Sequence, residues 1–513
     1  MSMYDCIVVG SGHAGSCAAL SAKEHVLMVD KCPAEWVGGN GYFTAGAHRT
    51  VHSGVDDLLS IVRNVTPEQA QVIDMEPYTR EEFVEDIMRL GARRSDPSLV
   101  AALVDNSRQA LTWLAQKAQV PFILSFHRQA FEVNGRQRFW GGLVTSVEDG
   151  GKGLIRAHQA ALKDAGVEIW FDCPVFDLVK RDGRVAGVVV RKDGLEVQIE
   201  SHAVVLAAGG FEANSELRVA HLGQSWDKAK IRGTPYNTGD CFAMAQSAGA
   251  KLTGDWSSCH STCWDWNAPS LAGARDLTNQ YTKSGYPLGI MINAHGLRFV
   301  DEGEDYRNYT YAKDLQFGKA ILLQPGGFAF QIWDTKALGY LRKEEYGDEV
   351  VEKIYAGSVE ELAHKLSAIG LQNGAQLIET LRTYNQGVKE HMSEHPELKW
   401  DPAVKDGLST ESSSTSLSPP KSNWALKIDE PPFVAVKVTC GITFTFGGLA
   451  IDPNSAAVLS ESTGAPIPGL FCTGEMVGNL FWSNYPGGSG LTAGAVFGRK
   501  AGESAWKCIP KMN

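Results

Sequence analysis

The chain opens with two short apolar runs separated by a stretch of small residues, a pattern that predicts a βαβ unit. Residues 4–10 (YDCIVVG) and 26–30 (VLMVD) have the length and composition of buried strands. Residues 14–22 between them suit a short helix. Because a helix joins the two runs, we expect the strands to be parallel, and the chain to begin with an α/β, Rossmann-like unit.

Further along, the periodicity changes from helix to short strands. Residues 97–118 place apolar side chains at three- and four-residue steps, with Asp96 suited to cap the helix and Pro97 to its first turn. Apolar runs joined by turns then predict a β meander, followed by a buried parallel strand at 203–210 that returns to the first sheet. The strands of the meander are expected at 167–171, 175–180, 185–191 and 195–199.

The middle of the chain has a different character. Residues from about 255 to 445 hold many Trp, Tyr and Asn residues, with helical stretches near 357–369 and 374–392. The Ser- and Pro-rich segment 409–422 is expected to be a surface loop. After this region the chain returns to strand, Gly-rich loop and helix. We therefore expect a nucleotide-binding domain made of residues 1–254 and 445–513, interrupted by an inserted substrate domain of residues 255–444.

Composition narrows the function. The 513 residues carry 48 basic and 59 acidic side chains, a formal net charge of −11, which argues against a nucleic-acid-binding surface. We expect no transmembrane segment, because no apolar run approaches the length of a membrane span. The ten cysteines are scattered without the spacing of a zinc site, so we expect no metal, reduced thiols and a cytoplasmic location.

A glycine motif follows the first strand. Gly10, Gly12 and Gly15 form GxGxxG at the start of the predicted helix, and Asp30 ends the second predicted strand. The first glycine permits the tight turn, the second lets main-chain N–H groups approach a pyrophosphate, and the third allows close helix packing. An acid at position 30 can accept both ribose hydroxyl hydrogens. This order of strand, motif, helix, strand and acid predicts a dinucleotide site.

Three more segments decide which dinucleotide. Residues 36–46 (WVGGNGYFTAG), 469–475 (GLFCTGE) and 484–491 (NYPGGSGL) resemble, in the same order, the flavoprotein family of fumarate reductase and succinate dehydrogenase. The resemblance covers nearly the whole chain. It implies a Rossmann-like, glutathione-reductase-type FAD-binding domain with an inserted α+β capping domain, and FAD bound without a covalent link. The last segment opens a helix whose N–H groups could hold the flavin O2 and stabilise negative charge at N1.

The resemblance also implies which residues contact FAD. The expected contacts are Gly10, Gly12, His13, Ala14, Gly15, Asp30, Lys31, Gly38, Gly39, Asn40, Thr44, Ala45, Gly46, Val175, Ala208, Gly209, Gly474, Glu475, Gly490 and Leu491.

This sequence has only some of the residues that the family uses to bind and convert its substrate. The family's capping-region His falls on His260, and its catalytic Arg falls on Arg307, which follows GxRFxxE at 296–302 with one extra residue. The family's other substrate His aligns with Phe444, and its Asn-Arg-x-Gly-Gly arginine aligns with Tyr485. The Glu and Arg that relay protons align near Thr282 and Gly285, which cannot carry protons. A plain fumarate reductase is therefore not expected.

Two branches of the family share the changed segments. GITFTFGG (441–448), PPKSNWA (419–425) and NYPGG (484–488) look like tricarballylate dehydrogenases, which oxidise tricarballylate to cis-aconitate. A Tyr-Pro before a Gly-rich flavin loop also resembles 3-ketosteroid Δ1-dehydrogenases, in which the Tyr acts as base. We expect a dehydrogenase that desaturates a CH–CH bond next to a carboxylate or carbonyl, of the tricarballylate type. The expected substrate contacts are His260, Arg307, Thr443, Tyr485 and Gly488.

Several alternatives stay open. The base that removes the substrate proton is Arg307, Tyr485 or another group, and Arg307 and His260 suit the anchoring of the activating carboxylate. Arginine is ordinarily locked as a cation, which makes it a demanding base. The substrate could instead be an enone or ketone, or the protein could be a non-catalytic electron-transfer partner. No Cys cluster offers an internal iron–sulfur relay, so we expect a small-molecule substrate and a separate electron acceptor.

Overall fold

The computed structural model describes residues 3–22, 25–139, 141–304, 317–401 and 404–509. The chain divides into two compact units. The first contains residues 1–224, 232–260 and 443–513, and the second contains residues 225–231 and 261–442. The chain passes between the units at 260/261 and 442/443, a few residues from the expected boundaries at 254/255 and 444/445.

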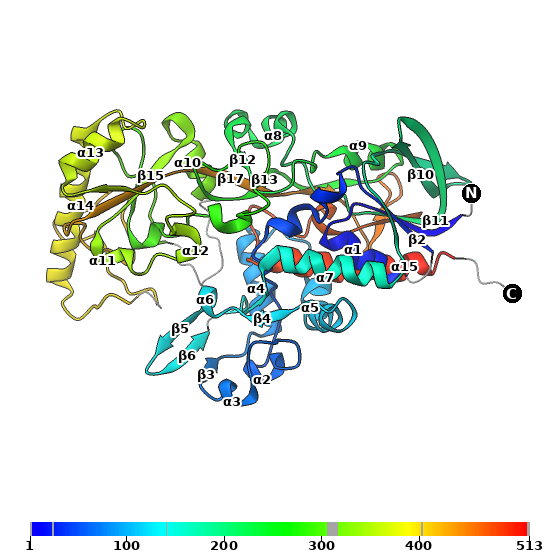
Figure 1. The fold of residues 1–513 in the computed structure, drawn as a ribbon, viewed down its shortest axis with the longest axis horizontal. Coiled ribbons are helices and arrows are strands. Elements are labelled where there is room, and N and C mark those ends of the chain that lie inside the picture. The colour runs from blue at the N-terminus through cyan, green and yellow to red at the C-terminus, as the bar shows by residue number, and fades with distance from the viewer. Residues whose placement is uncertain (1–2, 23–24, 140, 305–316, 402–403, 510–513) are drawn as a thin grey trace. The chain divides into compact units, whose positions relative to one another are not determined.

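The first unit is built on a largely parallel sheet (Figure 1). Its central strand β1 (Tyr4–Val9) pairs in parallel with β2 on one side and β11 on the other. The path across the sheet is β18 (Ala457–Leu459), β19 (Pro466–Cys472), β11 (Leu195–Leu206), β1, β2 (Val26–Val29) and β8 (Glu168–Trp170). The opening βαβ prediction is confirmed, because both strands and the helix α1 (His13–Ser21) between them lie where the apolar pattern placed them.

Strand β11 differs from the prediction. The runs 195–199 and 203–210 were expected as separate strands, but 195–206 is one continuous strand. Its first half pairs antiparallel with β10 (Arg184–Lys192), which pairs with β9 (Val175–Arg181), and its second half pairs in parallel with β1. The intervening polar residues stay extended because they continue the hydrogen-bonded ladder.

Helix α15 (Ser489–Trp506) packs lengthwise on α1 (Figure 1). Glycines make this approach possible: a Cβ on Gly498 would lie 2.6 Å from the carbonyl oxygen of Ala14, and one on Gly502 would lie 2.2 Å from that of Ala18. Helix α7 (Gly150–Asp164) also packs on α1, and α5 (Pro97–Lys117) packs on α15. Asp96 caps α5 as expected, by accepting from the N–H groups of Ser98 and Leu99.

Smaller elements complete the first unit. They are α2 (Val55–Leu58), α3 (Pro67–Ala70), β3 (Ile73–Met75), α4 (Arg80–Leu90), β4 (Phe122–Leu124), α6 (Phe126–Gln129), β5 (Ala130–Val133), β6 (Arg136–Phe139), β7 (Thr145–Val147), α8 (Ser215–Leu222) and α9 (Asp240–Ser247), with 3-10 turns η1 (Ala34–Trp36), η2 (Gly39–Phe43) and η7 (Gly474–Met476).

The second unit combines a six-stranded sheet with helices. Its strands are β12 (Lys230–Ile231), β13 (Leu252–Asp265), β14 (Ile290–Ile292), β15 (Ala329–Trp333), β16 (Ile354–Ala356) and β17 (Phe433–Leu449); β13 and β17 continue into the first unit. Its helices are α10 (Phe317–Leu322), α11 (Thr335–Leu338), α12 (Lys343–Tyr346), α13 (Val359–Ser367) and α14 (Gly374–Glu394), with 3-10 turns η3 (Gln224–Lys228), η4 (Thr278–Tyr281), η5 (Tyr286–Leu288) and η6 (Pro325–Gly327). The two long helical stretches expected here, α13 and α14, are confirmed.

The expectation of a surface loop at 409–422 is partly wrong. The segment has no helix or strand, but both of its ends are buried. Thr410 is 0% exposed, and the ammonium of the buried Lys421 donates to the carbonyl oxygen of Gly289 at 2.7 Å. A buried lysine satisfied in this way anchors the loop. In the described ranges no helix is both long and apolar enough to cross a membrane, and all ten cysteines are free thiols.

Candidate functional site

The glycine motif forms the turn between β1 and α1. A Cβ on Gly15 would lie 2.0 Å from the carbonyl oxygen of Gly10, so Gly15 is required for packing within the protein. A Cβ on Gly12 would meet nothing nearer than the carbonyl oxygen of Gly38, at 3.7 Å. Gly12 is the N-cap of α1 and no side chain caps that helix. The space and uncapped helix start at Gly12 therefore fit a phosphate group.

Asp30 is fixed at the end of β2. Its carboxylate accepts from the main-chain N–H of Ser11 at 2.7 Å, from the Ser11 hydroxyl at 2.6 Å and from the N–H of Cys32 at 2.9 Å. The N–H of Cys173 donates to the main-chain oxygen of Asp30, which brings the start of β9 and Val175 to the same edge. Asp30 is thus aimed by the glycine loop itself, as a ribose-binding acid requires.

The other predicted cofactor segments meet this loop. A Cβ on Gly39 would lie 3.5 Å from Cα of Gly12, and one on Gly474 would lie 2.7 Å from Cβ of Ala14. Thr44 holds its own turn, because its hydroxyl donates to the oxygen of Gly41 and accepts from the N–H of Gly46. Three other predicted contacts engage different partners within the unit: Ala45 accepts from Ser146, the N–H of Ala208 contacts Met476, and Lys31 binds Thr238 and Asp240.

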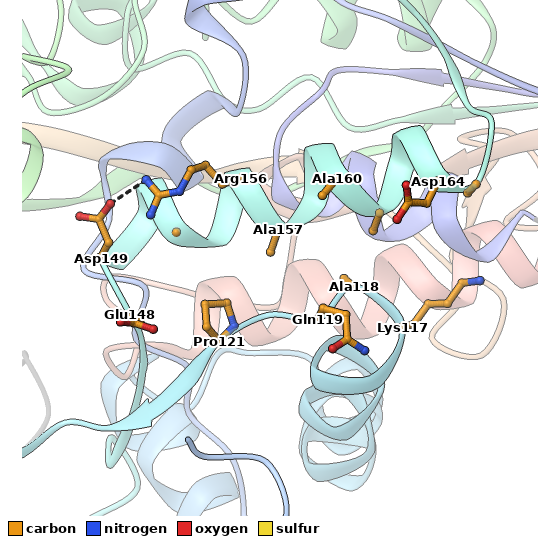
Figure 2. A pocket seen from close by; sticks show the side chains of 13 residues that line it. Lys117, Ala118, Gln119, Pro121, Glu148, Asp149, Arg156, Ala157, Ala160 and Asp164 are labelled. Carbon is orange, nitrogen blue, oxygen red and sulfur yellow. Dashed lines mark hydrogen bonds and ion pairs between the residues drawn. The ribbon is translucent and has the colours of Figure 1, made fainter. Parts of the chain in front are cut away.

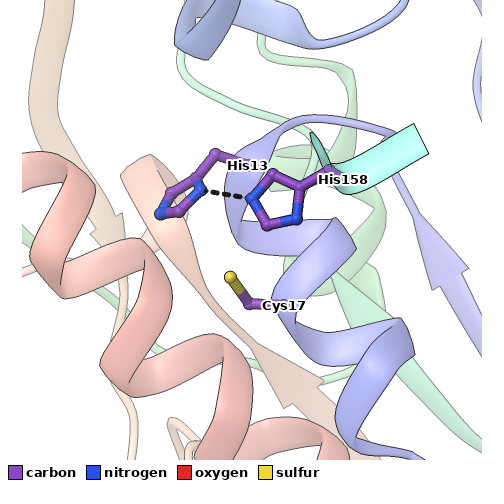
Figure 3. A group of neighbouring side chains, drawn as sticks. All are labelled: His13, Cys17 and His158. Carbon is purple, nitrogen blue, oxygen red and sulfur yellow. Dashed lines mark hydrogen bonds between the residues drawn. The ribbon is translucent and has the colours of Figure 1, made fainter. Parts of the chain in front are cut away.

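His13 joins the glycine loop to the C-terminal helix through a buried histidine cluster (Figure 3). Its Nε2 lies 2.9 Å from the carbonyl oxygen of Leu491, so Nε2 carries the proton. Burial lowers the pKa of His13 to about 4, so the ring is neutral and its Nδ1 accepts from Nε2 of His158 at 2.8 Å. The Cys17 thiol lies within 4.8 Å of both rings, and burial raises its pKa. His13 thus fixes the first turn of α15 against α1.

Asn40 and Glu475 lie in a second polar cluster. The amide of Asn40 donates to the main-chain oxygen of Thr443 at 2.7 Å and also to the carboxylate of Glu212. Glu475 accepts from the N–H and the hydroxyl of Thr445, at 2.7 and 3.0 Å. A Cβ on Gly209 would lie 2.5 Å from the Asn237 side chain. These contacts bring together, in one region of the first unit, four residues predicted from separate segments of the chain: Asn40, Gly209, Thr443 and Glu475.

The predicted substrate residues Tyr485 and His260 are in contact. Their rings are T-shaped with centroids 4.9 Å apart, and Nδ1 of His260 lies 3.3 Å from Oδ1 of Asn484. The Tyr485 ring also packs against three phenylalanines, Phe444, Phe446 and Phe481, with centroids 5.2 to 6.0 Å away. We call Tyr485 and these three residues the aromatic cluster. Gly488, at φ 82°, is the N-cap of α15 and follows directly.

The electrostatics of His260 limit the way in which it could anchor a substrate. Burial, reinforced by the charge of Arg232, lowers the pKa of His260 to about 3. The imidazole is therefore neutral at physiological pH and cannot anchor a carboxylate by charge. It can still offer a hydrogen bond. Arg307 lies outside the described residues. The GxRFxxE motif before it holds a buried ion pair of Arg298 and Glu302, which has a structural role in the second unit.

Two buried residues of this region were missed in the sequence. Arg49 is 1% exposed, and its guanidinium donates to the carbonyl oxygen of Gly487 at 2.9 Å and to the Tyr78 hydroxyl at 2.9 Å. Arg49 therefore stabilises the main chain of the 484–491 loop. Glu212 is 0% exposed and accepts from Asn40 and Asn237. Neither belongs to a recognisable motif, and only the spatial neighbours show their connection to the site.

A separate groove lies between α7 and residues 117–121, at the end of α5 and just after it (Figure 2). Its volume is about 550 Å³. Alanines of α7 form part of its wall, and Lys117, Arg156 and Asp164 line its edge. Arg156 is paired with Asp149 at 2.7 Å. The lining includes none of the predicted cofactor or substrate residues, so we assign no role to this groove.

The first unit thus has the fold and glycine architecture of a dinucleotide-binding flavoprotein. The chain belongs to the FAD-binding domain family, whose model matches residues 65–491. It is 29% identical to a probable fumarate reductase of Shewanella frigidimarina, over 98% of this chain and 74% of that protein. It is 27% identical to 4-oxocyclohex-2-ene-1-carboxylate 5-dehydrogenase of Sinomonas cyclohexanicum, over 97% and 93% of the two chains.

The fold comparison agrees. The structure of 3-ketosteroid Δ1-dehydrogenase from Sterolibacterium denitrificans matches with a TM-score of 0.71 and 20% identity, over 99% of this chain and all of that one. The predicted fold class, an α/β FAD-binding architecture with an inserted domain, is confirmed, as are FAD as cofactor and membership of the family that includes fumarate reductases. The protein is an FAD-dependent oxidoreductase.

The roles of Gly12 and Gly15, two of the three motif glycines, can be distinguished by experiment. We expect Gly15→Ala to destabilise the protein even without FAD, because the new methyl group collides with the main chain at Gly10. We expect Gly12→Ala to fold normally but to weaken FAD binding at least tenfold, since only a ligand would occupy the space. Thermal unfolding of the FAD-free protein and FAD titration measure the two effects. Equal loss of stability in both variants would contradict this assignment.

The buried histidines predict acid-sensitive stability. Burial lowers the pKa of His13 and His52 to about 4 and of His48 and His260 to about 3, below the value of about 6.5 expected when unfolded. The unfolded chain therefore binds protons first, and stability present above pH 6.5 is lost as the pH falls toward 4. Between its folded and unfolded pKa values, each histidine contributes a slope of up to about 1.4 kcal/mol per pH unit.

Urea unfolding between pH 7.5 and 4.5 measures this slope. We expect His158→Gln to reduce it, because burial also holds the pKa of His158 far below its usual value. The same substitution at the exposed His295 should leave it unchanged. A free energy of unfolding that stays constant over this pH range would contradict the prediction.

Proposed function

We propose that this protein transfers a hydride between FAD and a carbon–carbon bond next to the carbonyl group of an apolar, ring-containing substrate. The observation that carries the proposal is the aromatic cluster around Tyr485, beside the Gly-rich segment at the start of α15. Apolar aromatic walls favour a hydrophobic ring over a compact polyanion. The dehydrogenase of Sinomonas cyclohexanicum, named for a cyclic enone carboxylate, supports this substrate class.

The same geometry disfavours tricarballylate. Three carboxylates would require several cationic or donor groups to replace their hydration. Among the described residues around Tyr485, His260 is neutral, and the family's histidine and arginine positions hold Phe444 and Tyr485. Arg232 is the cation whose charge acts on His260, and Arg307 is the arginine that the sequence assigns to the substrate; together they suit a single carboxylate or carbonyl. We therefore place the enone or ketone class ahead of the tricarballylate type.

The residues divide the chemistry as follows. FAD, when bound, supplies the two-electron acceptor or donor. Tyr485 has a hydroxyl that can exchange a proton with the substrate or donate to its carbonyl oxygen, and the phenylalanines hold the ring in place. Asn484 positions the neutral His260, which contacts Tyr485 edge-on. In the desaturating direction, one carbon loses hydride and its neighbour loses a proton to the base.

Tyr485, Arg307 and a separate electron acceptor have the remaining roles in the reaction. We assign the proton transfer to Tyr485, and Arg307 is the competing base. A separate acceptor reoxidises the flavin, which we expect to be held without a covalent bond, and we place the enzyme in the cytoplasm. The proposed cofactor contacts are the residues predicted from the sequence, and the proposed substrate contacts are His260, Arg307, Thr443, Tyr485 and Gly488.

Reduction of the flavin under anaerobic conditions tests both the proposed substrate class and the role of Tyr485. We expect a cyclohexanone carboxylate or a 3-ketosteroid to bleach the flavin and tricarballylate to leave it oxidised. Tyr485→Phe keeps the ring but removes the hydroxyl, so bleaching should slow by about 10²–10⁴-fold with FAD binding unchanged. The control is Tyr340→Phe at an exposed tyrosine.

Two results would contradict these assignments. Bleaching by tricarballylate but by no ring ketone would exclude the proposed substrate class. Normal bleaching in Tyr485→Phe, together with its loss in Arg307→Gln, would transfer the base role to Arg307. Oxidation of the reduced protein by the matching enones tests the opposite direction of the same reaction.

A further inference from the structure

Two acidic side chains, those of Glu212 and Glu475, lie close together in the first unit. Glu212 follows the Gly209–Gly210 turn after β11, and Glu475 lies in η7 after β19. A Cβ on Gly210 would lie 2.1 Å from Oε1 of Glu475 and 2.7 Å from Oε2 of Glu212, so both carboxyl groups face the same point of the main chain. Position 210 has no side chain, and this lets the two acids approach each other.

The hydrogen-bond donors around Glu212 and Glu475 are unequally distributed among the carboxyl oxygens. Oε1 of Glu212 accepts from Asn40 and from Asn237, the latter at 2.6 Å. Oε1 of Glu475 accepts from the N–H and hydroxyl of Thr445. Oε2 of Glu212 receives no N–H or hydroxyl donor from the described part of the chain. A buried carboxylate oxygen needs a donor, and the group beside it is the other acid.

Among the described residues, the interactions that set the pKa values of the two acids include no cation among their main causes. The guanidinium of Arg218 donates to the main-chain oxygen of Glu212 at 2.5 Å. The side chains that donate to the two carboxyl groups, those of Asn40, Asn237 and Thr445, are neutral. Two negative charges that are buried and face the same point of the main chain repel each other strongly. We therefore expect the pair to retain one proton.

The proton resides mainly on Glu475. Burial and the negative charge of Glu212 raise the pKa of Glu475 well above its usual value, and burial also raises that of Glu212. The hydrogen bond between them stabilises the ionised form of Glu212 and the protonated form of Glu475. Glu212 is completely buried, whereas Glu475 keeps partial exposure and is the member that a ligand can reach.

We propose that Glu212 is a positioning residue that keeps Glu475 protonated beside the flavin, so that the pair presents a hydrogen-bond donor and a single shared negative charge. Asn40, a predicted FAD contact, is held by the same carboxylate and is oriented by it. Glu475 then resembles an alcohol more than an anion toward the cofactor. The inference concerns the FAD site and does not depend on which substrate the enzyme uses.

The pair makes a spectroscopic prediction. Infrared spectra of the FAD-loaded protein at pH 7 should contain the C=O stretch of a buried carboxylic acid. That band should disappear in Glu475→Gln, which removes the acid, and in Glu212→Gln, in which Glu475 loses its charged partner and ionises. The matched control is Glu216→Gln, the same change at an exposed site four residues farther along, and it should keep the band.

FAD binding gives a second readout that a purely structural role would not produce. We expect Glu212→Gln to weaken FAD binding about tenfold at pH 8, where Glu475 is ionised, and to recover at pH 5, where Glu475 regains its proton. Wild-type affinity should change little over that range. A missing carboxylic-acid band in the wild type would overturn the proposal even if neither variant folds. A band that survives both substitutions, or a loss of affinity that does not recover at pH 5, would also overturn it.

Discussion

The close packing of α1 against α15 organises the first unit of this protein. It joins the first strand–turn–helix of the chain to its last helix, and it is possible because glycines on α15 let the two backbones approach. The bond from His13 to Leu491 then links the two helix starts directly. Both starts lack a side-chain cap, so their N–H groups can serve an anionic or electron-rich cofactor.

The chemistry of the first unit relies on few free charges. The buried histidines around the glycine loop are neutral because burial lowers their pKa values, and we propose that Glu212 and Glu475 share a proton. In a poorly solvated site, neutral donors of fixed orientation cost less than isolated ions. The aromatic cluster continues this pattern toward the substrate. An apolar carbonyl compound suits such surroundings better than a compact polyanion.

The sequence predicted the parts that local rules control. The βαβ opening, the Asp96 cap, the packing role of Gly15 and the position of Asp30 after the second strand follow from periodicity, capping and turn geometry, which act over short distances. The continuity of β11 was missed because pairing with β10, and not local composition, keeps its polar centre extended. The buried residues Arg49, Glu212 and Lys421 were missed because their partners lie far away in the chain. The neutral state of His260 also depends on burial, which periodicity cannot show.

We propose that the glycine loop, Asp30 and the start of α15 together form one FAD site. Calorimetric titration of the FAD-free protein with FAD, and separately with FMN, tests it most directly. We expect one FAD per chain, and FMN binding at least a hundredfold weaker, because FMN lacks the adenosine monophosphate part, with the second phosphate and the ribose that Gly12 and Asp30 are placed to hold. Equal affinity for FMN and FAD, or no flavin binding at all, would contradict it.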